Sequence, residues 1–509
     1  MNPGTRKLSD DDRLTFLAHA ITMSSLYGFG PWPPHAQTLP DEPPRPDDGK
    51  PYFSSTVLDG IRSHHFSTEP APDTVAEVAD LLQSGAPPDH LHDRLASASA
   101  LAICDDLLRE LSRRSLPGKR LHEAGRWLAE YGTHREATKI GIVLLGACGD
   151  PDDRELLLLL GTLEEFTLYA VVALLRTQPD RQRAVYELAR RVTGWGRIHA
   201  VERLKGCDDP EIKAWLLRGG YRNDILAEYL APLAASTGDL YSALLDPEPD
   251  EALVDGAGGI LATLVRGEGG PTTGISAYAD GVPALARHAD LVATRTATIP
   301  RLDDLLTIVR CLRRPRSDEY GWAPGDRAAL LRRYEQVLEQ PRWSEMALAG
   351  VADPDAADFG WAAHCASLLG LPILAQVVAR LRLHPGDAYL WEEMTRLAEP
   401  AALVALAEES LPLENLDTGP GDRIFGSEHE RALECVVETL KTHPGLGLPL
   451  IRTALRNRGV RLRRRALRVL DAWPDVPDEA VGWVRAAYEV EPDDEIREEM
   501  RAFLGVTAR

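Results

Sequence analysis

The most constraining feature of this sequence is a repeat with a spacing of 34 residues over residues 427–504. A shift of 34 positions superimposes Leu433 on Leu467 and Val436 on Leu470. The apolar positions of successive helices therefore coincide, which is typical of helical hairpins that bury their apolar faces against neighbouring hairpins. The repeat predicts an all-α fold built from stacked helical hairpins.

A second repeat occurs earlier, where the pairs Asp150-Pro151 and Asp209-Pro210 follow apolar helical stretches 59 residues apart. The Asp side chain can accept the free N–H groups of the next helix, and proline occupies a position where no N–H is required. We expect each pair to begin a new helix. No segment shows the alternation of β-branched residues that is typical of strands, so sheet-based folds are not expected.

These turns, together with a helix start of the form Arg-x-x-Ala-Leu within 461–470 (RLRRRALRVL), resemble those of HEAT-like repeats. The spacing of 34 also matches tetratricopeptide repeats, but their W-x2-L-G-x2-Y pattern is not found in register. The resemblance implies a right-handed alpha-alpha superhelix, or solenoid, of HEAT-like helical hairpins. Most members of that family are scaffolds or peptide-binding surfaces, and a few are enzymes, notably alkylpurine DNA glycosylases and phycobilin lyases.

Changes of pattern along the chain predict six segments. An amphipathic helix is expected over 10–25, and the eight prolines within 27–53 favour an extended cap. The glycine-rich stretch 249–300 is expected to be an irregular joint between two arrays. The segments are an N-terminal helix with its proline-rich cap (1–71), an N-terminal HEAT-like array (72–248), the joint (249–300), middle helical hairpins (301–411), a loop (412–426) and C-terminal HEAT-like repeats (427–509).

The charge and the cysteines limit the classes of partner and the compartment. The formal net charge of −21 produces a field that opposes nucleic acids and anionic membranes. The six cysteines are scattered without a C-x-x-C pair, as in reduced proteins. Neither a secretory leader nor an apolar run of membrane-spanning length is found. We expect a cytoplasmic protein that binds neither nucleic acid nor membranes, and its oligomeric state is not predicted.

Patterns that carry catalysis or metal binding are not found. The sequence has no G-x-x-x-x-G-K-[ST] loop, no G-x-S-x-G elbow and no H-E-x-x-H pair. The clusters His64-His65 and His90-x-His92 lack metal-ligand spacing, and Cys365 is expected in the core. We therefore predict no catalytic, cofactor-binding or metal-binding residues.

One helix face carries a concentrated positive charge. Arg461, Arg464, Arg465 and Arg468 recur at helical spacing, and no acidic residue occurs within 448–470. Taken alone, this stripe indicates binding to phosphate or to an acidic partner. The repeat register instead places acidic residues of neighbouring repeats opposite it, with Glu434 opposite Arg468, so we expect ion pairs between repeats, and a partner-binding patch is the alternative. The acidic positions are Glu430, Glu434, Glu495, Glu498 and Glu499.

These observations predict a non-catalytic scaffold or adaptor that binds a protein or peptide partner on a solenoid surface. The alternative is a nucleic-acid-processing enzyme resembling the HEAT-type alkylpurine DNA glycosylases, for which Trp343, Trp361 and Trp391 with nearby glutamates supply the residue types. A third alternative is a protein that binds or modifies a small molecule. It requires a deep pocket, which we expect at the 249–300 joint.

Overall fold

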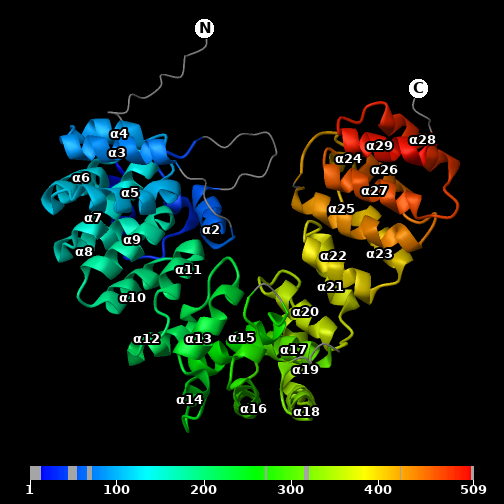
Figure 1. Cartoon of the computed structure of the whole chain (residues 1–509). Helices are drawn as coiled ribbons and strands as arrows, with labels where there is room; N and C mark the ends of the chain where they lie inside the picture. Colours follow the sequence, from blue (N-terminus) through cyan, green and yellow to red (C-terminus); the bar gives the residue numbers. More distant parts are fainter. Residues whose placement is uncertain are drawn as a thin grey trace. The chain divides into compact units, whose positions relative to one another are not determined.

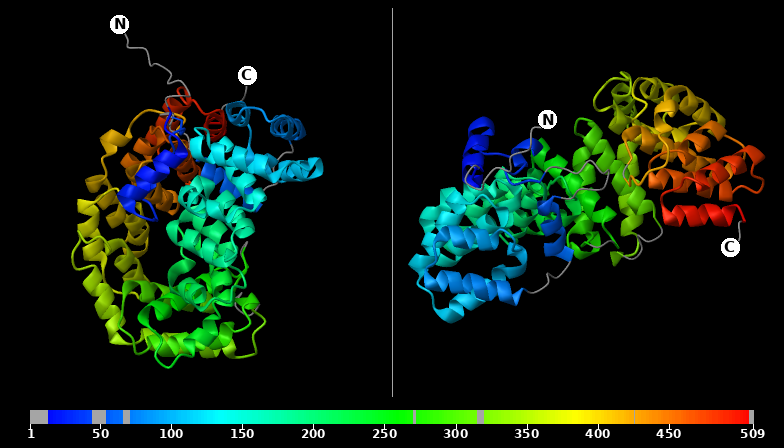
Figure 2. Two further views of the ribbon diagram at one scale, coloured as in Figure 1. Left: turned by 90° about the vertical axis from the view of Figure 1, so that its left-hand side faces the viewer. Right: turned by 90° about the horizontal axis from the view of Figure 1, so that it is seen from above.

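The described part of the chain is helical throughout, which confirms the all-α prediction (Figure 1). Within these residues there is no β-strand, and a single isolated parallel bridge joins Arg423 to Gly459. The two further views in Figure 2 likewise show helices joined by loops. The structure is a computed structural model that describes residues 13–43, 54–65, 71–269, 272–314, 320–424 and 426–505.

The chain forms two compact units. Among the described residues, unit 1 comprises those up to Ala293 together with Cys311–Leu331, and unit 2 comprises Thr294–Arg310 and the residues from Arg332 onward. The boundaries therefore fall after Ala293, within helix α17 (Ile299–Arg313) and within helix α18 (Asp326–Leu338).

In unit 1, helices pack against their next-but-one neighbours. One row runs from α3 through α5, α7 and α9 to α11, while α4 packs on α6 and α8 on α10 (Figure 1). This two-row order is how stacked hairpins bury the faces that a single hairpin leaves exposed. The helices of unit 1 are α1 (Phe16–Tyr27), α2 (Ser55–His65), α3 (Pro72–Ser84), α4 (Pro88–Leu95), α5 (Ala100–Arg114), α6 (Gly118–Tyr131), α7 (Arg135–Cys148), α8 (Arg154–Gly161), α9 (Glu164–Thr177), α10 (Arg181–Arg191), α11 (Gly194–Glu202), α12 (Pro210–Trp215), α13 (Ala231–Thr237), α14 (Leu240–Leu244), α15 (Glu251–Arg266) and α16 (Gly281–Val292).

Unit 2 shows the same order of contacts. One row runs through α20, α22, α25, α27 and α29, and the other through α21, α23, α26 and α28. Besides α17 and α18, the helices are α19 (Pro341–Gly350), α20 (Phe359–Leu368), α21 (Leu374–Leu383), α22 (Ala388–Leu397), α23 (Pro400–Ser410), α24 (Leu413–Leu416), α25 (Glu428–Thr439), α26 (Leu448–Leu455), α27 (Val460–Asp471), α28 (Asp478–Tyr488) and α29 (Asp494–Phe503).

The 34-residue repeat corresponds to the helices α25, α27 and α29, which pack on one another in sequence. Leu433 and Val436 on α25 and their equivalents Leu467 and Leu470 on α27 are all buried. Burying a leucine or valine side chain stabilises the fold by about 1.5–3 kcal/mol. The repeated apolar positions are therefore the core contacts between successive helices.

The Asp-Pro turns begin helical turns, as predicted. The Asp209 carboxylate accepts hydrogen bonds from the N–H groups of Glu211 and Ile212 at 2.8 and 3.3 Å, and Pro210 is the first residue of α12. Asp150 likewise accepts the N–H of Asp152 at 2.9 Å. Each Asp side chain satisfies backbone donors that the new helix leaves free.

The stretch 249–300, predicted as an irregular joint, forms the regular helices α15 over 251–266 and α16 over 281–292, while one boundary between the two units follows Ala293 within it. A Cβ atom at Gly256 would lie 1.8 Å from the carbonyl oxygen of Leu217, in the π-helical segment η4 (Leu216–Gly220). The glycine allows close packing of α15 on η4, and its low helix propensity misled the sequence-based prediction.

The N-terminal segment also departs from expectation. The helix predicted over 10–25 begins at Phe16, where the Thr15 side chain accepts the N–H of Ala18, and residues 10–12 of that prediction lie outside the described residues. After α1, Trp32 and Leu39 of the proline-rich stretch are buried within unit 1. The part of this stretch from 44 to 53 lies outside the described residues. Helix α2 within 1–71 and the short α24 within the predicted loop 412–426 were not expected.

Candidate functional site

The arginines predicted as a charged stripe lie on α27 and are engaged by acidic residues of the neighbouring helices. Arg461 and Arg465 both contact Glu434 on α25, with N–O distances of 3.1 and 3.3 Å, and Arg465 also contacts Glu438 at 2.7 Å. These carboxylates, with Glu438 first, raise the pKa of the Arg465 guanidinium against the opposing effect of its partial burial. Such exposed pairs each contribute about 0.2–1 kcal/mol.

The next arginines along α27 differ from each other. Arg464 contacts Glu495 and Glu499 on α29, at 2.8 and 3.2 Å. Arg468 is exposed and has no carboxylate partner among the residues the structure describes. The expected contact of Glu434 with Arg468 is wrong, because packed helices cross at an angle and the facing residues lie one to two turns from the register equivalents.

Arg463, on the same helix, points into the core instead. Its guanidinium forms a double hydrogen bond with the Glu491 carboxylate, at 2.8 and 2.6 Å, and both side chains are 0% exposed. It also donates to the carbonyl oxygens of Asn457 and Gly421. The α27 arginines other than Arg468 are therefore engaged by carboxylates of neighbouring segments.

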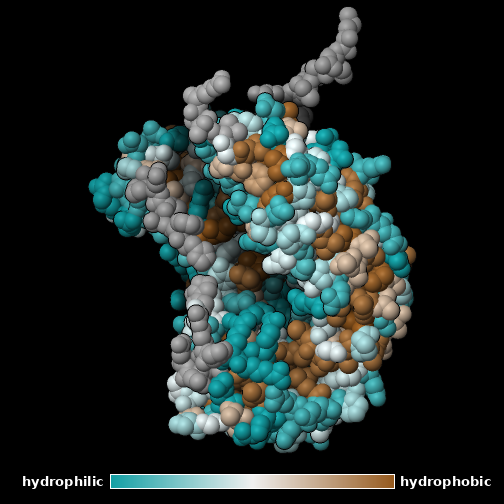
Figure 3. Space-filling model, turned by 90° about the vertical axis from the view of Figure 1, so that its right-hand side faces the viewer, coloured by the Kyte–Doolittle hydropathy of each residue, from teal (hydrophilic) through white to brown (hydrophobic). Residues whose placement is uncertain are grey.

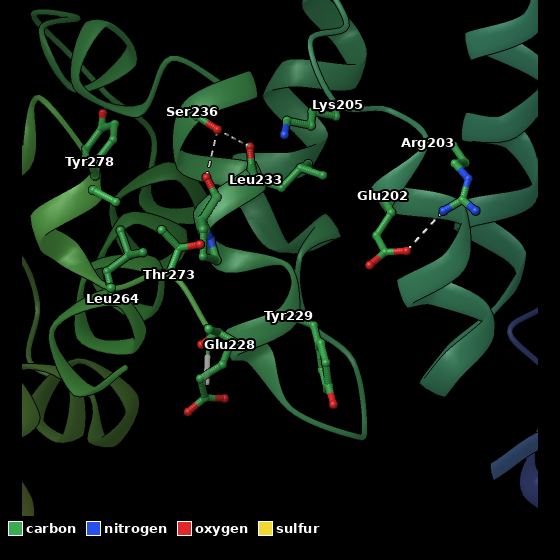
Figure 4. A pocket seen from close by; sticks show the side chains of 14 residues that line it. Glu202, Arg203, Lys205, Glu228, Tyr229, Leu233, Ser236, Leu264, Thr273 and Tyr278 are labelled. Atoms are coloured by element: carbon green, nitrogen blue, oxygen red, sulfur yellow. Dashed lines mark hydrogen bonds and ion pairs between the residues drawn. The ribbon is translucent and has the colours of Figure 1, made fainter. Parts of the chain in front are cut away.

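A cavity lies within unit 1, between the end of α11 and the segment that follows α15. It has a volume of about 540 Å³ and is open to solvent. Figure 4 shows the side chains of Glu202, Glu228, Tyr229 and Tyr278 arranged around it. Five further lining residues carry hydroxyl or cationic groups, namely Arg203, Lys205, Ser236, Thr272 and Thr273.

Two charged side chains of this pocket have a polar group without a partner among the described residues. Glu228 uses its Oε1 atom for the Arg266 guanidinium at 2.9 Å, while its Oε2 atom is buried and accepts no hydrogen bond. Lys205 is exposed and forms no ion pair with any described residue. The pocket can therefore attract an anion at Lys205, and the Glu228 carboxylate beside it has an oxygen without a hydrogen-bond donor.

The Tyr278 hydroxyl is fixed by the backbone, since it accepts the N–H of Tyr241 at 3.0 Å. Burial raises the pKa of Tyr278 to about 12, so the hydroxyl stays protonated and can donate a hydrogen bond into the pocket. Ser236 donates to the carbonyl oxygens of Pro232 and Leu233, which leaves the lone pairs of its oxygen open. The pocket wall thus offers both donors and acceptors.

A cluster of aromatic rings adjoins the pocket at Glu202 and Tyr229. The ring of His64 from α2 lies 5.1 Å from that of Trp195 and 5.3 Å from that of His199, both on α11. The Tyr229 ring packs against Trp195 and His64 at 5.4 and 5.7 Å. The pocket is therefore continuous with a cluster of titratable groups.

The imidazoles of this cluster differ in their surroundings. The hydrogen bond to Glu202 raises the pKa of the His64 imidazole, against the opposing effect of partial burial. Burial, and then the neighbouring His64, lower the pKa of His199 to about 4. His199 is therefore a neutral imidazole at pH 7.

Several sequence candidates are placed in the core and take no part in a site. Trp343 and Trp391 are fully buried and donate their indole N–H groups to the carbonyl oxygens of Val337 and Pro385, at 2.9 Å each. Trp361 is exposed. Cys365 is buried, and desolvation raises the pKa of its thiol to about 12. Neither buried tryptophan is available to stack on a nucleotide.

Large apolar side chains also reach the surface at several places. Figure 3 shows hydrophobic residues interspersed with hydrophilic ones over one face of the molecule. Phe29 is 74% exposed and lies under the Arg191 guanidinium, and Tyr389 in unit 2 is 75% exposed beside a shallow pocket that also includes Asp387 and Glu428. Isolated exposed apolar residues are normal on protein surfaces and do not by themselves identify a site.

The residues of the unit 1 pocket were not found from the sequence, because they come from segments as far apart as Glu202 and Tyr278. The available signal was the expectation of a pocket at 249–300, and Thr273 and Tyr278 do lie in that stretch. No protein-family model, curated protein or solved structure matches this chain. Of the helices that the structure describes, none is sufficiently long and apolar to cross a membrane.

Proposed function

We propose that this chain is a non-catalytic adaptor that recognises a peptide segment of a protein partner at the pocket of unit 1. Its stacked hairpins would form a right-handed, HEAT-like solenoid. The next-but-one packing of helices in both units and the Asp-Pro helix starts support this architecture. The six cysteines are unpaired, which fits a reducing cytoplasm. The net charge of −21 argues against nucleic acid as the partner.

The observation that carries the proposal concerns two groups at one open pocket, the Glu228 Oε2 atom and the Lys205 ammonium. Neither has a partner among the described residues. The buried Oε2 atom of Glu228 lacks a donor, and an unsatisfied buried acceptor costs about 1–3 kcal/mol. The Lys205 ammonium has no carboxylate partner among the described residues. A peptide supplies a hydrogen-bond donor for Glu228 through its backbone N–H groups or a basic side chain. It supplies an anion for Lys205 through an acidic side chain or its C-terminus.

A small zwitterionic molecule is the second candidate, and the size of the cavity favours it. The volume of about 540 Å³ lies within the range of about 300–1,000 Å³ that is typical of small-molecule sites. An amino acid or a similar compound would satisfy the same two groups. The experiment must therefore separate a polypeptide from a small molecule.

Site-specific photocrosslinking in the native host tests the proposal. A benzophenone amino acid is placed at Ser236 or Thr273, which line the pocket, and at Glu123, an exposed control position on α6 outside it. We expect a discrete crosslinked polypeptide from each pocket position and none from Glu123. A small-molecule adduct at the pocket positions would support the second candidate, and identical crosslinks at all three positions would contradict a pocket-specific partner.

A further inference from the structure

Beside the pocket, three side chains with metal-ligating atoms converge from two helices that are far apart in the sequence. His64 comes from α2, and His199 and Glu202 come from α11. One ligand atom from each lies within 4.8 Å of the others, and His64 Nε2 is 3.1 Å from Glu202 Oε1. Two imidazoles and a carboxylate form a common ligand set for Zn²⁺.

The spacing of these atoms suits a single ion. Bonds from Zn²⁺ to histidine nitrogen and carboxylate oxygen are about 2.0–2.2 Å long, so the ligand atoms of a tetrahedral site lie about 3.3–3.5 Å apart. The separations here extend from 3.1 Å for one pair to no more than 4.8 Å. Small side-chain rotations therefore suffice to bring all three atoms to bonding distance.

His199 provides an independent indication of a ligand. The residue is 5% exposed, its ring lies against the rings of His64 and Trp195, and neither ring nitrogen forms a hydrogen bond with any described residue. Buried polar groups are nearly always hydrogen-bonded. An imidazole that lies beside a second imidazole and a carboxylate, with no hydrogen-bond partner of its own, has a nitrogen lone pair that a metal ion would satisfy.

Outer contacts also orient the other two ligands. The Nδ1–H group of His64 donates to the carbonyl oxygen of Gly60 at 2.9 Å, which leaves Nε2 facing Glu202. Metal-bound histidines typically donate their second nitrogen in this way. The Oε2 atom of Glu202 accepts from Arg203 at 3.1 Å, which leaves Oε1 toward His64. Gly60 lies directly against Trp195, where any Cβ would come within 2.2 Å of the ring.

Two other groups of possible ligands in the described residues are already satisfied. Asp59, Glu136 and Glu165 surround the buried Lys139 ammonium at 2.6–2.9 Å. That cation takes the place a metal would occupy.

In the group around His122, Asp153 is paired with the Arg126 guanidinium at 2.8 Å, and Asp150 caps the next helical turn. Among the three groups found in the described residues, the cluster of His64, His199 and Glu202 is the one that combines two imidazoles with a carboxylate.

We propose that His64, His199 and Glu202 bind one Zn²⁺ ion, which fastens α2 to α11. The remaining coordination position would be filled by water or by a group of the pocket's occupant, since Glu202 belongs to both the cluster and the pocket wall. This assignment does not depend on a peptide being the natural ligand of the pocket.

Isothermal titration of the chelator-treated full chain with Zn²⁺ tests the site. We expect one Zn²⁺ per chain, and we expect Glu202→Gln and His199→Ala each to weaken binding by more than the ~10–100-fold that loss of an outer contact costs. His122→Ala is the matched control and should bind like the wild type. Absence of stoichiometric binding, or unchanged binding in Glu202→Gln, would overturn the assignment.

A second measurement covers the case in which His199→Ala fails to fold. Co²⁺ replaces Zn²⁺ in the wild type and in Glu202→Gln, whose side chain keeps its size and is partly exposed. The wild type should show the visible absorption of four-coordinate Co²⁺ with nitrogen and oxygen ligands, and the variant should lose it. In parallel, Zn²⁺ should slow backbone hydrogen exchange in α2 of the wild type, and no change in α2 would contradict a bridge between α2 and α11.

Discussion

At the residue scale, the pair Arg463–Glu491 joins α27 to the segment that precedes α29. Both side chains are wholly buried, so removing one partner leaves an uncompensated charge in the core. We expect Arg463→Ala to lower the free energy of unfolding by about 3–5 kcal/mol. Urea unfolding measures this, with the exposed Arg468→Ala as the control.

The double variant Arg463→Met, Glu491→Leu separates the charge effect from packing. Because well-packed apolar residues often replace a buried ion pair at little cost, its stability should lie closer to that of the wild type than to that of Arg463→Ala. A loss below about 1 kcal/mol in Arg463→Ala would show that the pair is not buried as described.

The sequence contained part of this information. Arg461, Arg464 and Arg465 were recognised as one charged face, and the structure places them on acidic neighbours. Arg463 precedes Leu467 and Leu470 by four and seven residues, which is the spacing of one helix face, so its inward direction could have been inferred. Its partner Glu491 could not, because it lies in a loop before α29 whose course only the tertiary structure defines.

At the element scale, the start of α25 depends on a reciprocal cap. Ser427 accepts the N–H of Glu430, and the Glu430 carboxylate accepts the N–H of Ser427 at 2.5 Å and contacts Arg458 at 3.1 Å. Burial alone would raise the pKa of Glu430, but the Ser427 N–H and the Arg458 guanidinium together lower it below 4.5. The cap therefore stabilises the fold above the unfolded pKa and loses this contribution as the pH falls through the folded value.

Glu430→Gln tests this dependence, because glutamine can still form the cap without a charge. The variant should be less stable than the wild type by about 1 kcal/mol at pH 7, and the difference should shrink as the pH falls from about 5 toward about 3. Urea unfolding at several pH values measures the difference, with the exposed Glu428→Gln as control. A difference that does not change with pH would contradict a charged cap.

Helix α15 offers a second test at this scale, since its glycines were mistaken for a joint. Gly256→Ala would place a Cβ atom against the Leu217 carbonyl and should lower stability by about 1–3 kcal/mol. Gly482→Ala, in the exposed middle of α28 where no atom lies within 4 Å, should raise stability by up to about 1 kcal/mol. Equal effects of the two changes, measured by thermal unfolding, would contradict the close packing of α15.

Helix existence was predictable from apolar periodicity and from the Asp-Pro caps, because both are local properties of the sequence. The helix α15 within 249–300 was not predictable in this way. Glycine lowers helix propensity by about 1 kcal/mol whether or not close packing of a neighbouring backbone requires it. The benefit of Gly256 comes from Leu217, which lies in a different element.

At the scale of the whole molecule, the division into two compact units predicts local responses to mutation. Arg463→Ala should speed hydrogen exchange in α25, α27 and α29 of unit 2 and leave α7 and α9 of unit 1 unchanged. Exchange followed by mass spectrometry on the full chain measures both. A uniform increase in both units would mean that the chain unfolds as one cooperative body.

The pocket belongs to this scale too, because its residues are collected from α11, α13, α15 and the segment after α15. The small-molecule alternative led us to expect a pocket near 249–300. Lys205 and Glu228 could not be predicted as lining residues, because they reach the cavity only through the packing of unit 1. The His64 cluster illustrates the same limit. The His-x-x-Glu spacing of His199 and Glu202 is visible in the sequence, whereas the approach of His64 is not.

The central claim is that the unit 1 pocket recognises a polypeptide, and quantitative affinity capture from the native host tests it most directly. The full chain is compared with Lys205→Glu, which reverses the unpaired charge in the pocket, and with Lys441→Glu, a matched exposed change in unit 2. We expect one or more proteins to be enriched by the wild type and by Lys441→Glu and to be lost with Lys205→Glu. The same captured proteins at the same levels with all three chains would contradict the claim.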